Sequence, residues 1–332
     1  MVNLTNFSER KVVMNILKHL DRRGELPLGD DIADFNLKNL RIGLKIDGFS
    51  AYNSKLPWSK WSDLGWKAVT ATVSDCIVKG SRPIALVASI GSPTKEGQQI
   101  IEDMVEGIVE ACRYYNVPYL GGDTNASKED VWIDVAVISV FETKPLPRNG
   151  ARPGNIVLAT GEYGLTGSAF HAYYANLTHI MENYPRMLEY SARPRVSLNL
   201  LEVLKSNRDC FTASMDVSDG LAFTLGEVAK ASKVDIYVDK VLLPREVYSY
   251  SEKAGINPFS LAFYGGEEYG AVLAVKEKCL NHVISELERR GIKVSVYGKV
   301  RKGEGQVWFK GKTLTCIGWD HFSKNNIIRK II

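Results

Sequence analysis

The sequence lacks the signature motifs of several common enzyme classes, and each absence excludes one kind of chemistry. Its 332 residues contain neither the Gly-x-x-x-x-Gly-Lys-Ser/Thr phosphate loop nor the Gly-x-Gly-x-x-Gly turn of dinucleotide-binding proteins. No Gly-x-Ser-x-Gly elbow marks a serine hydrolase. Gly161, Gly164 and Gly167 could approach a phosphate, but their spacing matches neither glycine pattern, so the signal is weak.

Cysteine and histidine are scarce, which bears on disulfides and metal sites. The five cysteines are widely spaced with no Cys-x-x-Cys pair, and this odd, scattered set argues against both a disulfide framework and a zinc site. The five histidines form no pair at metal-ligand spacing, so a zinc hydrolase is not expected.

Long apolar runs and a strong excess of one charge are also missing. No run approaches the roughly 18 to 20 residues that span a bilayer, and the N-terminus lacks the segments of a signal peptide. The net charge of +4 is small for this length, so no nucleic-acid footprint is indicated. We therefore expect a cytoplasmic protein with neither a nucleic-acid nor a membrane partner.

The length allows two domains with substantial cores, and strands mixed with helices predict an α+β or α/β layer architecture. Apolar periodicity predicts helices at 62–80, 100–112, from 221 and within 274–291, and strands at 40–47, 84–90, 131–141, 155–160, 211–216, 234–238, 261–263, 270–275, 294–300 and 307–309. Residues 148–154 are rich in turn formers, so we place a domain boundary there, giving domains 1–147 and 148–332.

The strand at 40–47 alternates cleanly between apolar and polar side chains. This alternation places Lys45 on the same face as Asp47 and predicts that Ile46 points into the core. Lys45 would then point toward neighbouring acids, although its head could equally lie in water along the surface. Asp75 follows on the next helix, off its apolar stripe, where a solvated aspartate is an equally good interpretation.

Gly121 and Gly122 precede Asp123 after a β-rich approach, which marks a place where the backbone turns or lies close to something else. The neighbouring carboxylate, hydroxyl and amide groups offer hard oxygens of the kind that magnesium prefers. The alternative is an Asx turn, in which Asp123 bonds its own backbone.

The same pattern recurs, because acidic residues stand at the ends of many predicted elements: Asp30, Asp47, Asp75, Asp123, Asp216, Asp219 and Glu267. If these acids converge in a cleft, their repulsion requires cations, and magnesium ions carrying a polyphosphate would supply them. Asp216 and Asp219, at a strand end and a helix start, could share one ion. Their alternative roles are a strand-end turn and an N-cap.

The ordered motifs resemble those of thiamine-monophosphate kinases over nearly the whole chain. They are Gly29-Asp30-Asp31, Asp47, Val73-Ser74-Asp75, Gly121-Gly122-Asp123-Thr124, Arg148-x-Gly150-Ala151-x-Pro153-Gly154, Met215-Asp216-Val217-Ser218-Asp219-Gly220-Leu221, Gly266-Glu267-Glu268-Tyr269 and Gly318-Trp319-Asp320-His321-Phe322. Each is short, but eight in order are jointly specific. The resemblance implies a two-domain architecture like that of aminoimidazole ribonucleotide synthetase, with a C-terminal α/β domain and with N-terminal domains that pair as a homodimeric β-barrel.

The resemblance also implies an activity and its residues. It implies magnesium-dependent transfer of the ATP γ-phosphoryl group to thiamine monophosphate, with ATP bound at the domain cleft. Several magnesium ions would be held by Asp30, Asp47, Asp75, Asp123, Asp216 and Asp219, with Asp47, Asp75, Asp123 and Asp216 essential for turnover. Nucleotide contacts would come from Gly122, Asp123, Arg148 and Ser218, and substrate contacts from Ser54, Glu267 and Trp319. For Trp319 the alternative is C-terminal packing.

The chain departs from the family pattern at three places. Lys45-Ile46 stands where Ser-Thr is usual, Ser54 stands near an expected histidine, and Glu268 replaces an aspartate. The acceptor is therefore less well supported than the ATP and magnesium residues. The alternatives are a related enzyme that phosphorylates another small molecule, and a non-catalytic nucleotide-binding dimer. If Lys45 offsets carboxylate charge, the protein should hold fewer magnesium ions than relatives with Ser-Thr.

Overall fold

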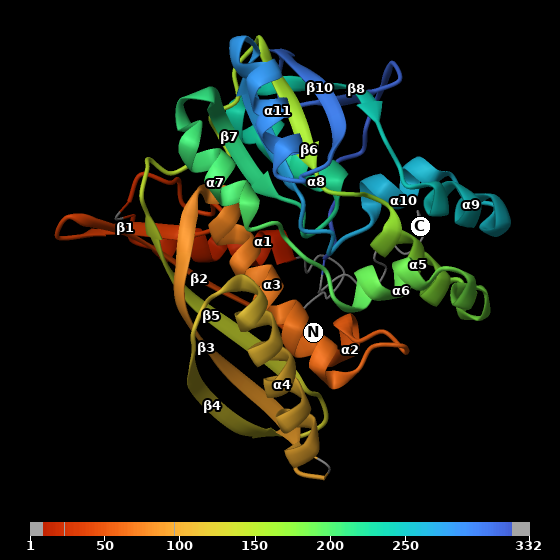
Figure 1. The fold of residues 1–332 in the computed structure, drawn as a ribbon. Helices are drawn as coiled ribbons and strands as arrows, with labels where there is room; N and C mark the ends of the chain where they lie inside the picture. The colour runs from red at the N-terminus through yellow and green to blue at the C-terminus, as the bar shows by residue number, and fades with distance from the viewer. Residues whose placement is uncertain (1–8, 23, 96, 321–332) are drawn as a thin grey trace, which may run out of the picture.

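The computed structural model describes residues 9–22, 24–95 and 97–320, which form two β-sheets with helices packed against them (Figure 1). The first sheet has the strand order β1-β2-β5-β3-β4, and the second has the order β12-β11-β8-β10-β6-β9-β7. The strands of the first sheet are β1 Ala33–Leu37, β2 Leu40–Ser50, β3 Ser81–Pro93, β4 Tyr119–Ser127 and β5 Trp132–Phe141. Those of the second are β6 Asn155–Thr160, β7 Phe211–Asp216, β8 Val234–Val241, β9 Ala271–Lys276, β10 Val294–Lys302, β11 Val307–Phe309 and β12 Lys312–Thr313.

The helices fall into three groups along the chain. Before the second sheet lie α1 Glu9–Ile16, η2 Leu17–His19, α2 Ala51–Ser54, α3 Trp61–Lys79 and α4 Gly97–Tyr115. Between β6 and β7 lie α5 Leu165–Tyr174, η3 Thr178–Asn183, α6 Pro185–Ala192, α7 Asn199–Ser206 and η4 Arg208–Cys210. The remainder are α8 Leu221–Ser232, α9 Arg245–Ala254, α10 Pro258–Tyr264, η5 Glu277–Cys279 and α11 Leu280–Arg289.

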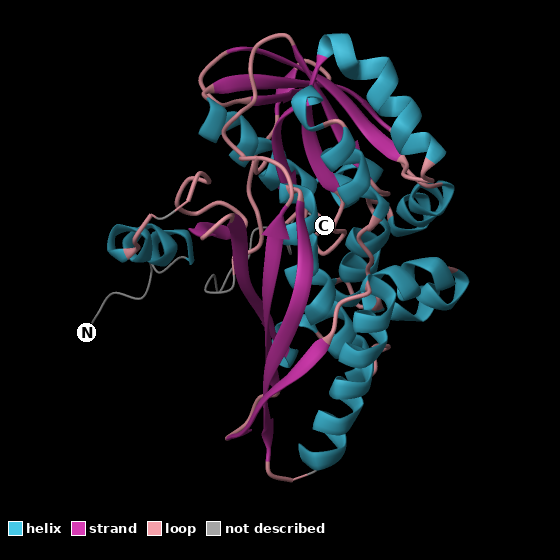
Figure 2. Ribbon diagram, turned by 60° about the vertical axis from the view of Figure 1, so that its left-hand side comes forward, coloured by secondary structure: helices cyan, strands magenta, loops and turns pink. Residues whose placement is uncertain are grey.

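The first sheet is covered by helices on one face only, as Figure 2 shows from the side. Helix α3 packs along β2, β5 and β3, and α4 packs beside α3. Seventeen of the 19 residues of α3 are buried, because the second half of the molecule covers the helix from the other side. Helix α3 is therefore the central element that carries polar residues from the first sheet toward the second half.

The opposite face of the first sheet carries exposed apolar side chains. Ile46 is 65% exposed, and Leu44, Val87, Leu120 and Ile138 are exposed on the same face. The prediction that Ile46 points into the core was wrong, because alternation along β2 fixes the two faces but not which of them a helix covers. A single chain forms an open five-stranded sheet, and no closed barrel is present among its described residues.

The second sheet has helices on both faces. Helices α7 and α11 pack on one face, and α8 packs on the other (Figure 1). Most of the predicted strands are confirmed, but residues 261–263 belong to helix α10 instead of a strand. Asn257 caps this helix by accepting a hydrogen bond from the Phe259 amide at 3.0 Å, and Pro258 occupies its first turn.

Two of the five cysteines are joined, contrary to the expectation from their scattered spacing. Cys210 and Cys279 form a disulfide across 69 residues of sequence. The pairing follows from the sheet, since β7 lies beside β9 with Phe211 opposite Val275, which brings the flanking cysteines together. Spacing along the chain could not reveal this neighbour relation.

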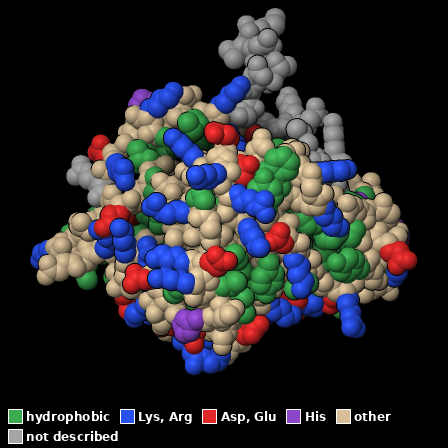
Figure 3. All heavy atoms as spheres, turned by 90° about the horizontal axis from the view of Figure 1, so that it is seen from above, with side chains coloured by type: hydrophobic (Ala, Val, Ile, Leu, Met, Phe, Trp, Pro, Cys, Tyr) green, Lys and Arg blue, Asp and Glu red, His purple; other side chains and the backbone are tan. Residues whose placement is uncertain are grey.

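Charged side chains of both signs lie on the face over the second sheet, with Lys and Arg the more prominent (Figure 3). Seen from above, Lys and Arg side chains are interspersed with acidic and hydrophobic ones (Figure 3). None of the helices in the described part of the chain combines the length and apolar character that crossing a bilayer would require.

Candidate active site

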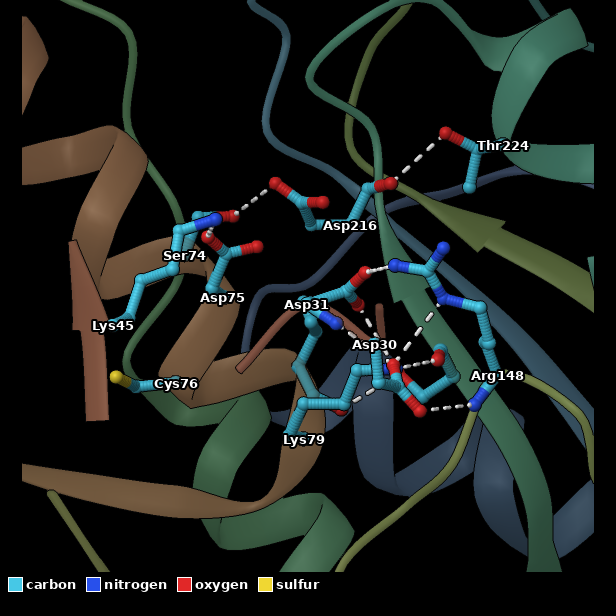
Figure 4. A network of polar contacts seen from close by, with 12 residues as sticks. Asp30, Asp31, Lys45, Ser74, Asp75, Cys76, Lys79, Arg148, Asp216 and Thr224 are labelled. Carbon is cyan, nitrogen blue, oxygen red and sulfur yellow. Dashed lines mark hydrogen bonds and ion pairs between the residues drawn. The ribbon is translucent and has the colours of Figure 1, made fainter. Parts of the chain in front are cut away.

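A cavity of about 410 Å³ lies between the two halves of the molecule, and acidic side chains from both halves line it. Asp31, Asp47 and Asp75 come from the first half, while Asp216 and Asp219 come from the second. Helix α3 and strand β7 thus bring carboxylates from distant parts of the sequence to one place, and Figure 4 shows the polar contacts around them.

Three of these carboxylates form a tight cluster. Oxygens of Asp31, Asp75 and Asp216 all lie within 4.8 Å of one another, and all three residues are buried. Ser74 donates a hydrogen bond to Asp216 Oδ2 at 3.2 Å, and Thr224 donates to the Asp216 carbonyl oxygen at 2.9 Å. Asp75 and Asp216 were predicted to converge, but Asp31 was missed in favour of its neighbour Asp30.

Asp30 and Asp31 are held by two cations, and we call Asp30, Asp31, Lys79 and Arg148 the paired corner (Figure 4). Lys79 Nζ lies 2.6 Å from Asp30 Oδ1 and 2.9 Å from Asp31 Oδ2, with its side chain fully buried. Arg148 Nη2 lies 2.5 Å from Asp31 Oδ1, and its backbone amide donates to Asp30 Oδ2 at 3.1 Å. Lys79 also donates to the Ser214 carbonyl on β7, so this corner ties the two halves together.

A second part of the cluster has fewer cations beside its carboxylates, and we call Lys45, Asp47, Asp75 and Asp216 the open edge. Lys45 Nζ lies 2.7 Å from Asp75 Oδ2 and 3.5 Å from Asp47 Oδ2. The predicted direction of Lys45, toward the acids and on the face of Asp47, is confirmed. This ammonium is shared by several carboxylates instead of being matched one to one.

The aspartates of the two parts of the cluster differ in the direction in which their pKa values are shifted. Burial alone would raise the pKa of Asp31, but the charges of Lys79 and Arg148 outweigh it and lower the pKa. Burial raises the pKa of Asp216 to about 7, and the nearby charge of Asp31 adds to the shift. The pKa of Asp75 also lies well above its usual value, mainly because of burial. The single ammonium of Lys45 therefore does not fully balance the carboxylates of the open edge.

The carboxylates of Asp31, Asp75 and Asp216 fit a divalent cation that prefers hard oxygen ligands. The cluster supplies carboxylate oxygens at short mutual distances, and the raised pKa values of Asp75 and Asp216 show that their charge is incompletely balanced. Asp219 lines the same cavity, where burial, Glu9 and Asp47 raise its pKa to about 7. Asp30 differs from Asp31, although both contact Lys79 and Arg148, because its carboxylate is not among the three whose oxygens cluster together.

Asp123 is not brought to this cluster within one chain. Asp123 on β4 pairs with Ser89 on β3. Ser89 pairs in turn with Asp134 on β5, and Asp134 pairs with Gly48 on β2. Because paired residues share a face, Asp123 lies on the face of Gly48, opposite to that of Asp47. Two strands also separate β4 from β2.

Gly122 is explained by close packing of two strands. A Cβ at this position would lie 1.6 Å from the Ala88 carbonyl oxygen on β3, so only glycine fits. Gly122 stays beside Asp123 on the outer strand, and its nucleotide contact remains a prediction.

Glu267 lies in the cavity but is already bonded to a buried lysine. Lys67 Nζ on α3 donates to Glu267 Oε2 at 2.6 Å and to the Ser54 carbonyl oxygen at 3.1 Å. This contact joins α3, the end of α2 and the loop before β9. The sequence analysis missed Lys67, because its partner is 200 residues away.

Ser218 and Glu267 belong to two loops that are joined by backbone hydrogen bonds. The Glu267 amide donates to the Ser218 carbonyl at 2.6 Å, and the Tyr269 amide donates to the Val217 carbonyl at 2.9 Å. Glu267 adopts a φ of 60°, a left-handed conformation that is uncommon for a residue other than glycine. The two loops therefore present Ser218 and Glu267 to the cavity as one unit.

Three stacked aromatic rings also line the cavity. Trp319 stacks on Tyr174 with ring centroids 6.3 Å apart and an interplanar angle of 12°, and Tyr174 stacks on Phe170 at 6.2 Å. All three rings line the cavity, as do Ser54 and Glu267. Trp319 is thus placed where it could stack on a ligand ring, while His321 and Phe322 lie outside the described residues.

Family comparisons agree with this arrangement of two domains. Residues 29–141 match the family model described as AIR synthase related protein, N-terminal domain. Residues 152–310 match the corresponding C-terminal domain.

Sequence relatives show which family the chain belongs to among the proteins related to AIR synthase. The chain is 31% identical over 279 residues to the thiamine-monophosphate kinase of Pyrobaculum calidifontis, covering 84% of this chain and 86% of that protein. The chain belongs to the thiamine-monophosphate kinase family. A second kinase, from Nitrosopumilus maritimus, is 29% identical over 92% of this chain and 97% of its own length. A solved structure of AaThiL complexed with AMPPCP and TMP matches with a TM-score of 0.82 at 26% identity, covering 97% of this chain and 99% of that chain.

In this member of the thiamine-monophosphate kinase family, the spacing of Gly161, Gly164 and Gly167 has a structural explanation. Glu268 accepts a hydrogen bond from the Gly164 amide at 2.6 Å, at the N-terminus of α5. The chain's own carboxylate therefore occupies the place where the glycines at 161, 164 and 167 could have met a phosphate. The contact with Glu268 therefore explains these glycines without a bound phosphate.

Proposed function

We propose that this chain transfers the γ-phosphoryl group of ATP to thiamine monophosphate, giving thiamine diphosphate and ADP. The observation that carries the proposal is one cavity that is lined both by a carboxylate cluster and by stacked aromatic rings with Glu267. A metal–phosphate group suits the carboxylates, and a cationic aromatic ligand suits the rings and Glu267. The relatives' printed names and the bound AMPPCP and TMP of AaThiL support the same assignment.

The proposed transfer is a direct in-line displacement. A phosphate oxygen of thiamine monophosphate attacks the γ-phosphorus of ATP, the bond to the bridging oxygen breaks, and ADP leaves with that electron pair. An ionised phosphate needs no strong general base, so positioning and charge neutralisation supply most of the acceleration. Among the described residues that line the cavity there is neither a cysteine nor a histidine, which accords with a mechanism without a covalent intermediate.

The residue roles follow from the positions in the cavity. Magnesium ions, when bound, would neutralise phosphate charge, and Asp31, Asp47, Asp75, Asp216 and Asp219 would hold them. Asp30 and Arg148 would fix the geometry of Asp31 through the paired corner. Ser218 and Arg148 line the nucleotide side, and Ser54, Glu267 and Trp319 line the side proposed for the thiamine moiety.

We also propose a cytoplasmic homodimer, formed through the outer face of the first sheet, with domains 1–147 and 148–332. The exposed apolar side chains of Leu44, Ile46, Leu120 and Ile138 make a continuous surface on that face. A second copy would cover it in a C₂ interface. Asp123 lies on this face as well, so pairing would place its side chain at the interface between the two copies.

Chromatographic detection of thiamine diphosphate tests the activity. The protein with ATP, magnesium and thiamine monophosphate should form thiamine diphosphate and ADP in equal amounts. Product only with other acceptors in a panel of phosphorylated and amine compounds would favour a related enzyme. Binding of ATP without turnover of any acceptor would favour a non-catalytic nucleotide-binding dimer.

Sedimentation equilibrium at low micromolar concentration tests the dimer. The wild type should sediment at twice the chain mass, and Ile46→Lys should shift it toward the monomer. A monomer mass for the wild type would refute the pairing.

A further inference from the structure

Lys45 places an ammonium group among the carboxylates of the cavity. It projects from β2, on the face that α3 covers, and its Nζ atom reaches Asp75 Oδ2 at 2.7 Å and Asp47 Oδ2 at 3.5 Å. The Lys45 side chain is 23% exposed and that of Asp75 only 6%. The ammonium therefore lies at the inner wall of the cavity, close to two groups that could bind metal.

The other cations near the cluster already contact the aspartates of the paired corner. Six aspartates line the cavity, Asp30, Asp31, Asp47, Asp75, Asp216 and Asp219, and three cations contact members of this set, Lys45, Lys79 and Arg148. Lys79 and Arg148 contact Asp30 and Asp31 in the paired corner. Lys45 is thus the cation available to the open edge among the described residues that line the cavity.

We propose that Lys45 takes the place of one divalent cation between Asp47 and Asp75. This proposal rests on the proposed magnesium–nucleotide chemistry. A divalent ion bound to Asp75 Oδ2 would lie within a few ångströms of the ammonium and be repelled by it. A lysine head is compact and carries its charge at one point, so it fits such a position better than a planar guanidinium.

A fixed ammonium and a metal ion do not have the same consequences. The ammonium is covalently attached, so the Asp47–Asp75 pair stays partly neutralised when no metal is present. A divalent ion would instead come and go with nucleotide and with metal concentration. The protein should therefore bind nucleotide with one divalent ion fewer than a variant in which position 45 is neutral.

Counting bound Mn²⁺ in the presence of AMPPCP tests this directly, by equilibrium dialysis without turnover. Lys45→Ser should bind one more Mn²⁺ per bound AMPPCP than the wild type, and Lys45→Met should gain the same ion with weaker affinity. Lys45→Arg keeps the charge and should keep the wild-type count. Lys278→Ser, at an exposed position in η5, is the matched control for the loss of one positive charge.

Thermal unfolding in EDTA and in Mn²⁺ gives a second readout that needs no nucleotide. Lys45→Ser and Lys45→Met should melt at a lower temperature than the wild type in EDTA, and Mn²⁺ should raise their Tm by more. Equal Mn²⁺ counts and equal Mn²⁺-dependent shifts in Tm for Lys45→Ser and the wild type would overturn the role of Lys45. A wild type that binds no Mn²⁺ with AMPPCP would overturn the proposed function instead, and the Tm comparison would still decide the role of Lys45.

Discussion

The paired corner and the open edge are neighbouring parts of one acidic cluster, yet they are neutralised differently. In the paired corner, Asp31 contacts both Lys79 and Arg148, and its pKa lies below the usual value. In the open edge, Asp75 and Asp216 are equally buried, but their pKa values are raised. The chain itself balances the charge of Asp30 and Asp31, which helps to hold the two halves together, although Asp31 still offers an oxygen to the cluster. The charge of Asp75 and Asp216 is left for a ligand to balance.

Removing the lysine of the paired corner should cost the most. Lys79→Met leaves two buried carboxylates with Arg148 as their one remaining cation, and breaking a buried ion pair from one side typically costs about 3–5 kcal/mol of the free energy of unfolding. Urea denaturation in EDTA measures this loss, with the exposed Lys278→Met as control. A loss below ~1 kcal/mol would show that the corner is not a structural ion-pair network.

A change in the open edge should instead affect turnover. Asp216→Asn keeps the shape of the side chain but removes one anionic oxygen, and we expect kcat to fall on the order of 10²-fold or more. The stability of the metal-free protein should stay the same or rise, because repulsion from Asp31 is removed. Steady-state kinetics at saturating magnesium measure the first effect, with exposed Asp239→Asn as control. A normal rate at limiting magnesium would mean that Asp216 only shapes a turn.

The two parts should also respond to pH with opposite signs. The pKa of Asp216 is raised to about 7, so between about pH 4 and 7 the folded state binds more protons than the unfolded state, and stability falls as pH rises. Asp31, with its lowered pKa, contributes stability that is lost as pH falls below about 4. In EDTA, Tm should therefore decline from pH 5 to pH 7.5, and saturating magnesium or Asp216→Asn should reduce the decline. A Tm in EDTA that rises across this range contradicts the assignment.

The sequence predicted most strands, because alternation is local, and it predicted that Asp47, Asp75 and Asp216 meet. It could not show which face of β2 is covered, so the direction of Ile46 was wrong. Asp31 was missed because one of two adjacent aspartates had to be chosen without knowing that Lys79 and Arg148 hold them both.

Contacts between segments that are distant in the sequence could not be predicted either, because local patterns do not show which segments lie side by side. Lys67 meets Glu267 across the two halves, and Cys210 meets Cys279 across neighbouring strands. The apolar residues 261–263 predict a strand, although three apolar residues in a row fit a helix equally well. The helix signal, Asn257 followed by Pro258, lies just upstream.

The smallest expected effect concerns the aromatic rings of the same cavity, which belong to neither part of the cluster. Trp319 stacks on Tyr174, and a ligand ring stacked there would gain about 0.5–1.5 kcal/mol from such a contact. Trp319→Ala should therefore raise KM for thiamine monophosphate roughly three- to tenfold, with kcat within about threefold of the wild type. Trp319→Phe keeps a ring and should recover most of the loss. A fall in kcat like that of Asp216→Asn, without a change in KM, would place Trp319 with the charged groups instead. An unchanged KM in Trp319→Ala would mean that the ring only packs against Tyr174.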